Sequence, residues 1–309
     1  MEAMNSPTGL KLLKPPYPLR KLRPLHPLSF TWRQKKLLVG LSKSDWQFSQ
    51  NLSNPEGRLQ DCLINSPVKL VLVDTNIGEP RINHLADMCL LAEKPLFLRL
   101  SSIAELPQKR NPTDWLIKRG LDLIAASLLL VIFSPLMLML ALMIKNESSG
   151  PIFFYQWRVG QRGKLFRIIK FRSMVVGAEK RHQIVMFGQQ GLHKCENDPR
   201  VTRLGGWMRK YSLDELPQLF NVLRGEMSLV GPRPWALYDA LRISKTGDRR
   251  LNSLPGITGA WQVKSRSTML DMDVVNECDL DYLRKWSLWT DLKILCMTLP
   301  KVLSGFGAF

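Results

Sequence analysis

The sequence has few residues of the kinds that crosslink a chain or mark it for export. Its five cysteines are odd in number, widely spaced and without a C-x-x-C pair, so neither a disulfide framework nor a zinc site is indicated. The first residues are polar and rich in proline, lysine and arginine, and they lack the apolar core of about 7–15 residues that a cleavable secretory signal needs. We therefore expect a reducing, cytosolic setting.

Acidic residues are also scarce. The chain of 309 residues has 26 Asp and Glu against 44 Lys and Arg, which gives a formal net charge of +18. Such a charge indicates anionic partners, and nucleic acid, acidic lipid headgroups and phosphorylated substrates all fit. Hydrophobic residues make up 45% of the chain, which is enough to build the core of one large or two modest domains.

Residues 1–31 combine many prolines with basic side chains and contain too little apolar surface to order themselves. We expect a flexible basic arm here. Its charge suits attachment to an acidic membrane face, at about 1 kcal/mol for each Lys or Arg near the surface. A solvated tail without a partner fits the composition equally well.

Residues 32–110 are predicted to form a small α/β accessory domain built on a βαβ unit. Three short apolar runs have the composition of strands: residues 35–40, 69–74 and 95–100. Apolar residues recur at helical spacing between residues 82 and 91. Asp74 ends a strand at the edge where parallel sheets bind ligands, but no glycine-rich phosphate loop follows it. We therefore expect a docking or regulatory domain without chemistry of its own.

A membrane helix is predicted over about residues 116–145. No charged residue occurs from Leu123 to Ile144, a length that at about 1.5 Å per residue crosses a hydrocarbon core of about 30 Å. Basic residues, which prefer the cytoplasmic side, flank both ends: Lys118, Arg119 and Lys145. Pro135, which follows Ser134 at the midpoint, removes a backbone hydrogen bond. A helix that bends at this hinge and returns to the same face satisfies both features, and a straight span is the alternative.

Two adjacent carboxylates, Asp214 and Glu215, stand between basic runs. Pro217 fits the first position of a helix and Gly225 fits the position just past its end, so a short helix is predicted between them. The carboxylates then lie at the positive end of this helix, where a divalent cation or a phosphoryl group can meet them. Ser212 and Glu215 also match a capping box, which needs no ligand.

The stretch from Tyr211 to Pro234 resembles a known family when it is taken with two further motifs, Lys170-Phe-Arg-Ser-Met174 and Pro255-Gly-Ile-Thr-Gly259. The family is the bacterial sugar transferases, monotopic phosphoglycosyl transferases. The resemblance covers roughly residues 115–303. It implies an α+β, membrane-associated protein in which residues 111–309 form a re-entrant membrane helix and a small cytosolic catalytic domain with interfacial helices. It implies nothing about residues 1–110.

This resemblance implies an enzyme that transfers a sugar-1-phosphate from a UDP-sugar to a polyprenol phosphate such as undecaprenyl phosphate. UMP is released, and polysaccharide or glycoconjugate assembly begins at the cytoplasmic face of the inner membrane. In the family mechanism, the Asp of the pair attacks phosphorus and forms a covalent phosphosugar intermediate. The matching residue here is Asp214, with Glu215 beside it, and the two are the implied ligands of Mg²⁺. The implied partners are both substrates, membrane lipid and downstream glycosyltransferases, with no nucleic acid.

The resemblance also implies which cations bind the phosphates: Lys170, Arg172, Arg209, Arg233 and Arg266. Each of them alone also fits a solvated surface charge, but their gathering around one acidic pair favours phosphate binding. Two other interpretations stay open. A membrane-tethered binder of nucleic acid or anionic lipid needs only the charge, and leaves the acidic pair unexplained. A scaffold without catalysis needs a broken acidic pair, and this pair is intact.

Towards the C-terminus, Trp261, Trp286 and Trp289 accompany an apolar helix predicted from Ser287 to about Leu299, with Pro300 limiting its length. Tryptophan and lysine beside apolar residues are typical of a helix that lies in a membrane interface. Packing in the protein core accounts for the same residues.

Overall fold

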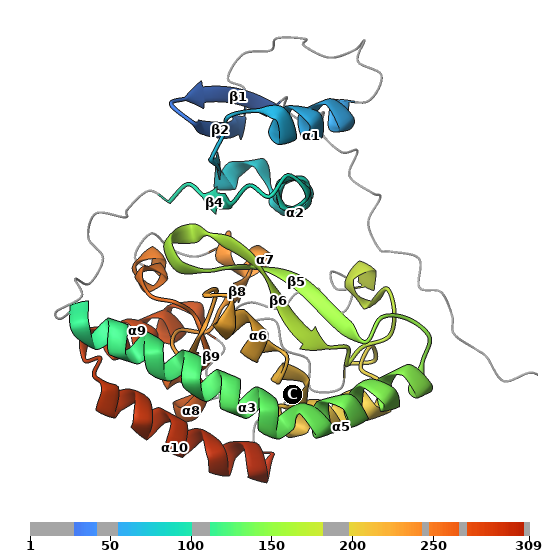
Figure 1. Cartoon of the computed structure of the whole chain (residues 1–309), viewed down its shortest axis with the longest axis vertical. Coiled ribbons are helices and arrows are strands. Elements are labelled where there is room, and N and C mark those ends of the chain that lie inside the picture. Colours follow the sequence, from blue (N-terminus) through green and yellow to red (C-terminus); the bar gives the residue numbers. More distant parts are fainter. Residues whose placement is uncertain are drawn as a thin grey trace, which may run out of the picture.

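The computed structural model describes residues 28–41, 55–100, 112–181, 198–242, 247–265 and 271–305. It is a mixed α/β protein in which an N-terminal unit, residues 28–41 and 55–100, stacks on a larger C-terminal unit, residues 112–305 (Figure 1). Residues 1–27, most of the predicted basic arm, lie outside the described residues.

The N-terminal unit is a four-stranded sheet with two helices. Its strands lie in the order β1 (Leu28–Arg33), β2 (Lys36–Leu41), β3 (Leu70–Val73) and β4 (Leu96–Leu98), and its helices are α1 (Pro55–Asn65) and α2 (Glu79–Leu91). The strands β2, β3 and β4 are parallel, as the three apolar runs predict. In contrast, β1 begins inside the segment predicted to be flexible. It pairs antiparallel with β2, and most of its residues are exposed. Its residues alternate apolar and polar side chains, Leu28-Ser-Phe-Thr-Trp-Arg33, a strand pattern that the overall composition of residues 1–31 obscured.

The C-terminal unit contains two small sheets. One has the order β6 (Leu165–Phe171), β5 (Phe153–Val159) and β8 (Trp235–Ala236), and the other pairs β7 (Ser228–Val230) with β9 (Gly256–Thr258) in parallel. The helices that surround them are α3 (Pro112–Glu147), α5 (Arg203–Lys210), α6 (Gln218–Leu223), α7 (Leu237–Ala240), α8 (Ala260–Ser265), α9 (Met272–Arg284) and α10 (Leu288–Ser304). Short 3-10 turns complete the unit: η3 (Gln161–Gly163), η4 (Ala178–Arg181), η5 (Leu213–Glu215) and η6 (Gly247–Asn252).

Helix α3 is long and apolar enough to cross a membrane. One side packs into the core through buried residues such as Ala126, Leu140 and Ile144, and the other side exposes large apolar residues along its length. The helix continues through Pro135, and its ribbon changes direction part-way along (Figure 1). Because Pro135 has no N–H, the carbonyl of Val131 loses its helical partner. The Ser134 hydroxyl donates a hydrogen bond of 2.8 Å to that same carbonyl, which explains why a serine precedes this proline.

The basic residues before the apolar segment, Lys118 and Arg119, make contacts inside the protein. Lys118 is buried, and its Nζ lies 2.6 Å from the carboxylate of Asp291 on α10 and 3.0 Å from the Val230 carbonyl. Arg119 donates to the carbonyls of Met227 and Val222. Both side chains therefore fix the first turns of α3 to the rest of the C-terminal unit.

Helix α10 is longer than predicted. It continues through Pro300 to Ser304 and ends at Gly305, whose φ of 64° is a left-handed helix stop. Pro300 therefore does not end the helix, because a helix tolerates the loss of one hydrogen bond where its other contacts hold it. Core packing describes Trp261, which is buried. Trp289 on α10 is 74% exposed, so core packing does not account for it.

Candidate functional site

The candidate site is a pocket, one part of which lies where strand β6 meets helix α6. Asn221 joins the two elements, since its side-chain amide donates to the Arg167 carbonyl and its Oδ1 accepts from the Ile169 N–H. This junction places Lys170, at the end of β6, against η5. The Lys170 Nζ donates to Glu215 Oε1 at 2.6 Å, and both side chains are more than four-fifths buried.

The acidic pair lies just before α6, as predicted. Helix α6 starts after Pro217, and Gly225 follows its end with a φ of 79°. Asp214 is only 6% exposed, whereas the side chain of Glu215 reaches the pocket. Ser212 has a φ of 55° and makes no capping hydrogen bond with its side chain. Because Glu215 is paired with Lys170 instead, the capping-box alternative does not describe this turn.

Two glycine-containing motifs bring Arg233 to the same place. Strands β7 and β9 approach so closely that a Cβ on Gly256 would overlap the backbone nitrogen of Gly231, so neither position has room for a side chain. The segment after Gly231 is held by Arg250, whose Nη2 donates to the Arg233 carbonyl at 2.6 Å. The Arg233 guanidinium lies over the ring of Trp261, 5.7 Å from its centroid.

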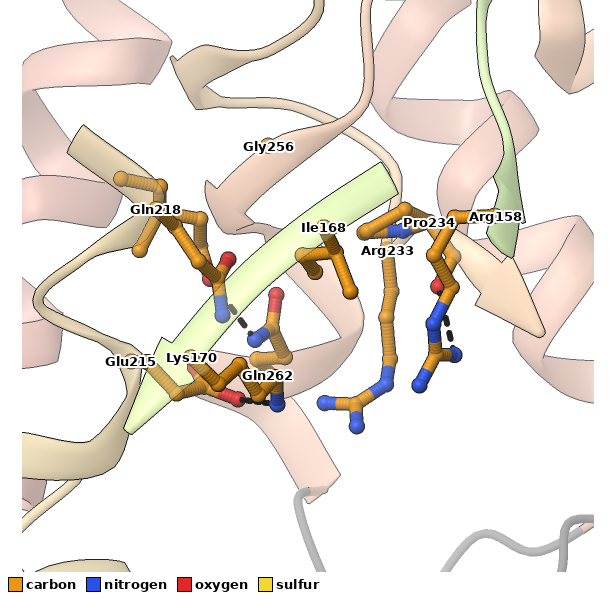
Figure 2. A pocket seen from close by; sticks show the side chains of 10 residues that line it. Arg158, Ile168, Lys170, Glu215, Gln218, Arg233, Pro234, Gly256 and Gln262 are labelled. Carbon is orange, nitrogen blue, oxygen red and sulfur yellow. Dashed lines mark hydrogen bonds and ion pairs between the residues drawn. The ribbon is translucent and has the colours of Figure 1, made fainter. Parts of the chain in front are cut away.

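These elements line a partly open pocket. Its lining comes from both sheets and from α6, α8 and η5: Arg158, Ile168, Lys170, Glu215, Gln218, Arg233, Pro234, Gly256, Ile257 and Gln262. Figure 2 shows the Lys170–Glu215 pair towards one end and the side chains of Arg158 and Arg233 next to each other towards the other. Cationic side chains therefore lie at both ends of the pocket, and at one end the charge of Lys170 is balanced by Glu215.

Arg158 is the main residue of this pocket that the sequence did not predict. Its Nη1 donates to the Pro234 carbonyl at 3.2 Å and its Nη2 to Gln156 Oε1 at 2.6 Å. Its Nε is buried and has no hydrogen-bond partner among the described residues. Burial lowers the pKa of Arg158, and the neighbouring charge of Arg233 adds to this. A signal was present in the sequence, because Gln156 and Arg158 alternate with aromatic residues.

Two of the predicted phosphate-binding residues, Arg209 and Arg172, lie away from the pocket. Arg209 donates from Nε to the Ser173 hydroxyl at 2.9 Å and does not line the pocket. Arg172 is buried, and its guanidinium donates to the carbonyls of Ser148 and Ser149 at the end of α3. This contact caps a helix, so the geometry gives Arg172 a structural part in place of the predicted one. Arg266 lies outside the described residues.

The predicted Mg²⁺ site has Asp214 and Glu215 as its protein ligands. Among the described residues, no group of three or more His, Cys, Asp and Glu side chains gathers to hold a metal ion. A metal bound wholly by protein ligands is therefore not indicated there. Mg²⁺ is commonly held by one or two carboxylates together with substrate phosphates and water, and Asp214 with Glu215 fits that pattern.

A further buried acid lies behind Arg158. Asp239 on α7 is 6% exposed, and its Oδ1 has no hydrogen-bond partner among the described residues. Burial raises the pKa of Asp239 to about 6, although the charges of Arg158, Arg242 and Arg233 oppose the shift.

Comparison with known proteins identifies a family and several relatives of this chain. The family model described as bacterial sugar transferase matches residues 113–305. Galactosyl transferase CpsE of Streptococcus agalactiae is 39% identical over 249 residues, which are 80% of this chain and 52% of that protein. The undecaprenyl-phosphate galactose phosphotransferase of Salmonella typhimurium is 41% identical over 200 residues, 62% of this chain and 42% of that protein.

A relative from Caulobacter vibrioides is described as UDP-glucose:undecaprenyl-phosphate glucose-1-phosphate transferase. It is 44% identical over 241 residues, which are 70% of this chain and 87% of that protein. The chain therefore matches nearly all of this relative, but only about half the length of the two larger ones.

Proposed function

We propose, since the chain belongs to the bacterial sugar transferase family, that it transfers a sugar-1-phosphate from a UDP-sugar to a polyprenol phosphate such as undecaprenyl phosphate. The names of the relatives from Salmonella typhimurium and Caulobacter vibrioides support the acceptor, and the latter supports the UDP-linked donor. The observation that carries the proposal is the acidic pair of η5 beside a pocket with cations at both ends.

The transfer takes two displacements at one phosphorus atom. A carboxylate oxygen of Asp214 attacks the β-phosphorus of the donor, and the bond from that phosphorus to the UMP oxygen breaks with its electron pair. UMP leaves, and a phosphosugar remains on Asp214 as a mixed anhydride. A phosphate oxygen of the acceptor then attacks the same phosphorus, forms the lipid diphosphate and frees Asp214. Covalent catalysis replaces one difficult step by two easier ones.

The cations make this attack possible, because donor and nucleophile are both anionic. The guanidinium group of Arg233 can grip phosphate oxygens in a bidentate fork. Arg158, whose Nη1 and Nη2 already donate to Pro234 and Gln156, adds positive charge beside it. Lys170 supplies a charge at the other end of the pocket and holds Glu215 in place at 2.6 Å. Mg²⁺, when held by Asp214 and Glu215 with the donor phosphates, supplies a Lewis acid that neutralises charge on the departing oxygen.

The same proposal places the protein on the cytoplasmic face of the inner membrane as a monotopic protein. Its support is that both ends of α3 contact one folded unit: Lys118 pairs with Asp291 near the start, and Arg172 donates to the Ser148 and Ser149 carbonyls at the end. A straight span would separate these contacts across the bilayer. The exposed apolar side of α3 and a hinge at Ser134 and Pro135 suit a helix that enters and leaves on one face.

The experiment uses membranes that contain the protein, supplied with polyprenol phosphate, Mg²⁺ and a panel of UDP-sugars, and measures UMP release. We expect release with at least one donor, dependent on both the metal and the acceptor for full turnover. Salt-dependent DNA binding without release of UMP from any donor would favour the alternative of a membrane-tethered binder.

A further inference from the structure

The hairpin of β5 and β6 has one face towards the pocket and the other towards the N-terminal unit. Side chains alternate between the two faces of a strand, so Trp157 and Val159 point opposite to Arg158. Arg158 lines the pocket together with Ile168 and Lys170 of β6. Figure 1 shows the hairpin between α2 of the N-terminal unit and α6 of the C-terminal unit.

The back face of this hairpin is built into the core of the N-terminal unit. Val159 and Leu165 are buried in the same apolar cluster as Leu96 and Leu98 of β4, and Trp157 packs against it. Trp157 Nε1 also donates a hydrogen bond of 3.0 Å to Asp87 Oδ1 on α2. The two units therefore share a core at the strand that carries Arg158.

The N-terminal unit also adds charge near the same arginine. Burial raises the pKa of Tyr238 and of Asp239 on α7, and the negative charge of Glu79, in the first turn of α2, adds to both shifts. Those two residues in turn interact with Arg158. Strand β5 also pairs with β8, where Arg158 lies opposite Ala236, three residues after Arg233. The placement of both pocket arginines thus depends on β5.

We propose that the N-terminal unit is a positioning element of the donor site. It fixes the position of Arg158 because Asp87 binds Trp157 on the opposite face of the same strand, β5. The inference rests on the proposed function and assigns a part in it to the N-terminal unit. Trp157 and Asp87 are positioning residues, since neither lines the pocket. A displacement of about 1 Å at a substrate-holding group can cost roughly 100-fold in rate, so loss of a single contact to β5 should have a smaller but measurable effect.

The test compares four variants of the full-length protein in membranes. Asp87→Ala removes the acceptor for Trp157, and Trp157→Phe removes the donor but keeps an aromatic ring. Asp87→Asn keeps an acceptor oxygen and is the conservative rescue. Asp61→Ala is the matched control, since Asp61 is exposed on α1 of the same unit. The measurements are KM for the UDP-sugar, KM for polyprenol phosphate, kcat, and UDP affinity by calorimetry.

We expect Asp87→Ala and Trp157→Phe to weaken UDP affinity and raise the donor KM by about three- to tenfold, in line with the loss of one hydrogen bond. The acceptor KM and kcat should stay within about twofold of wild type, as should all values for Asp87→Asn and Asp61→Ala. In an Arg158→Ala background, Asp87→Ala should have no further effect on UDP affinity, since the effects of substitutions at coupled residues on the binding free energy are not additive.

The positioning proposal is overturned if Asp87→Ala and Trp157→Phe match the Asp61→Ala control, or if Asp87→Ala weakens UDP affinity equally with and without Arg158. A wild-type protein that binds UDP but releases no UMP would refute the proposed function alone, and the UDP affinities would still decide the positioning role. A wild-type protein that binds no UDP would overturn both.

Discussion

At the scale of single residues, the basic side chains divide into those that face the pocket and those that hold the fold. Arg158 and Arg233 line the pocket, whereas the guanidinium of Arg172 donates hydrogen bonds to the carbonyls at the end of α3. Lys118 and Arg119 likewise satisfy buried groups. A charge of +18 is therefore a poor guide to the site, because part of it is structural.

This division predicts different outcomes for two matched substitutions. Arg233→Lys keeps the charge but loses the bidentate fork, so the donor KM should rise by about tenfold, the equivalent of about 1.4 kcal/mol, with little change in melting temperature. Arg172→Lys should instead lower the melting temperature, because buried carbonyls lose donors, and leave the donor KM nearly unchanged. UMP-release kinetics and thermal unfolding of both variants check this. The reverse pattern would return phosphate binding to Arg172.

Asp239 predicts a dependence of stability on pH. Burial raises its pKa in the folded protein to about 6 from an ordinary value of 3.8, so between these values the folded state binds more protons than the unfolded state. Stability then falls as pH rises through this window, by up to about 3 kcal/mol for a shift of about two pKa units. Asp239→Asn cannot titrate, so its stability relative to wild type should increase from pH 4 to pH 7. Chemical unfolding at several pH values measures this, and a constant difference would contradict it.

At the scale of elements, the apolar periodicity of the sequence predicted what depends on local pattern. The three parallel strands of the N-terminal unit and the helix after Pro217 are present because their apolar runs and breakers act locally. The pattern failed where distant contacts decide. Helix α10 passes Pro300 although the sequence predicts a stop there. Strand β1 was missed for another reason: residues 28–33 alternate apolar and polar side chains, but the prediction for residues 1–31 rested on their proline-rich, basic composition.

The same holds for the pocket: residues in motifs were predicted from the sequence, and residues placed by contacts distant in the sequence were not. Glu215, Lys170 and Arg233 line the pocket, and each belongs to a motif on which the family resemblance rests. Arg158 was missed and Arg172 was assigned to the pocket, because only the pairing of β5 with β6 and β8, and the end of α3, decide where these two side chains point.

The Ser134–Pro135 pair of α3 predicts a coupled effect of two substitutions. Ser134→Ala removes the hydroxyl that satisfies the Val131 carbonyl, so it should destabilise the protein by roughly 1–2 kcal/mol. Pro135→Ala restores the N–H that this carbonyl lacks, so the double variant should be more stable than Ser134→Ala alone. Thermal unfolding in one detergent measures all three. Simple additivity of two losses would show that the hydroxyl does not serve this carbonyl.

At the scale of the whole molecule, the hairpin of β5 and β6 lies between the N-terminal unit and the rest of the C-terminal unit (Figure 1). The exposed apolar sides of α3 and α10 lie at one end of the molecule and the N-terminal unit lies at the other (Figure 1). If α3 and α10 meet the membrane, the N-terminal unit points away from it into the cytosol. The pocket is then within reach of a soluble nucleotide sugar and of a lipid acceptor.

This arrangement predicts the topology of the chain in cells. Tags at Met1 and at Phe309 should both be protected from a reagent that cannot cross the inner membrane, because both ends of α3 contact one folded unit. Both tags should react once the membrane is permeabilised, which is the control. Labelling of one tag alone in intact cells would restore the straight span.

The most direct test of the account is whether Asp214 forms the covalent intermediate. Asp214→Asn has a similar shape but lacks the charge and the attacking oxygen, so turnover should fall by several orders of magnitude while folding survives. The decisive measurement mixes wild-type enzyme with UDP-sugar and Mg²⁺, without acceptor, and examines its peptides by mass spectrometry. The account predicts a phosphosugar adduct on the peptide that contains Asp214, lost in Asp214→Asn and on addition of polyprenol phosphate. An Asp214→Asn protein that releases UMP at the wild-type rate, with no adduct on the wild-type peptide, would contradict it.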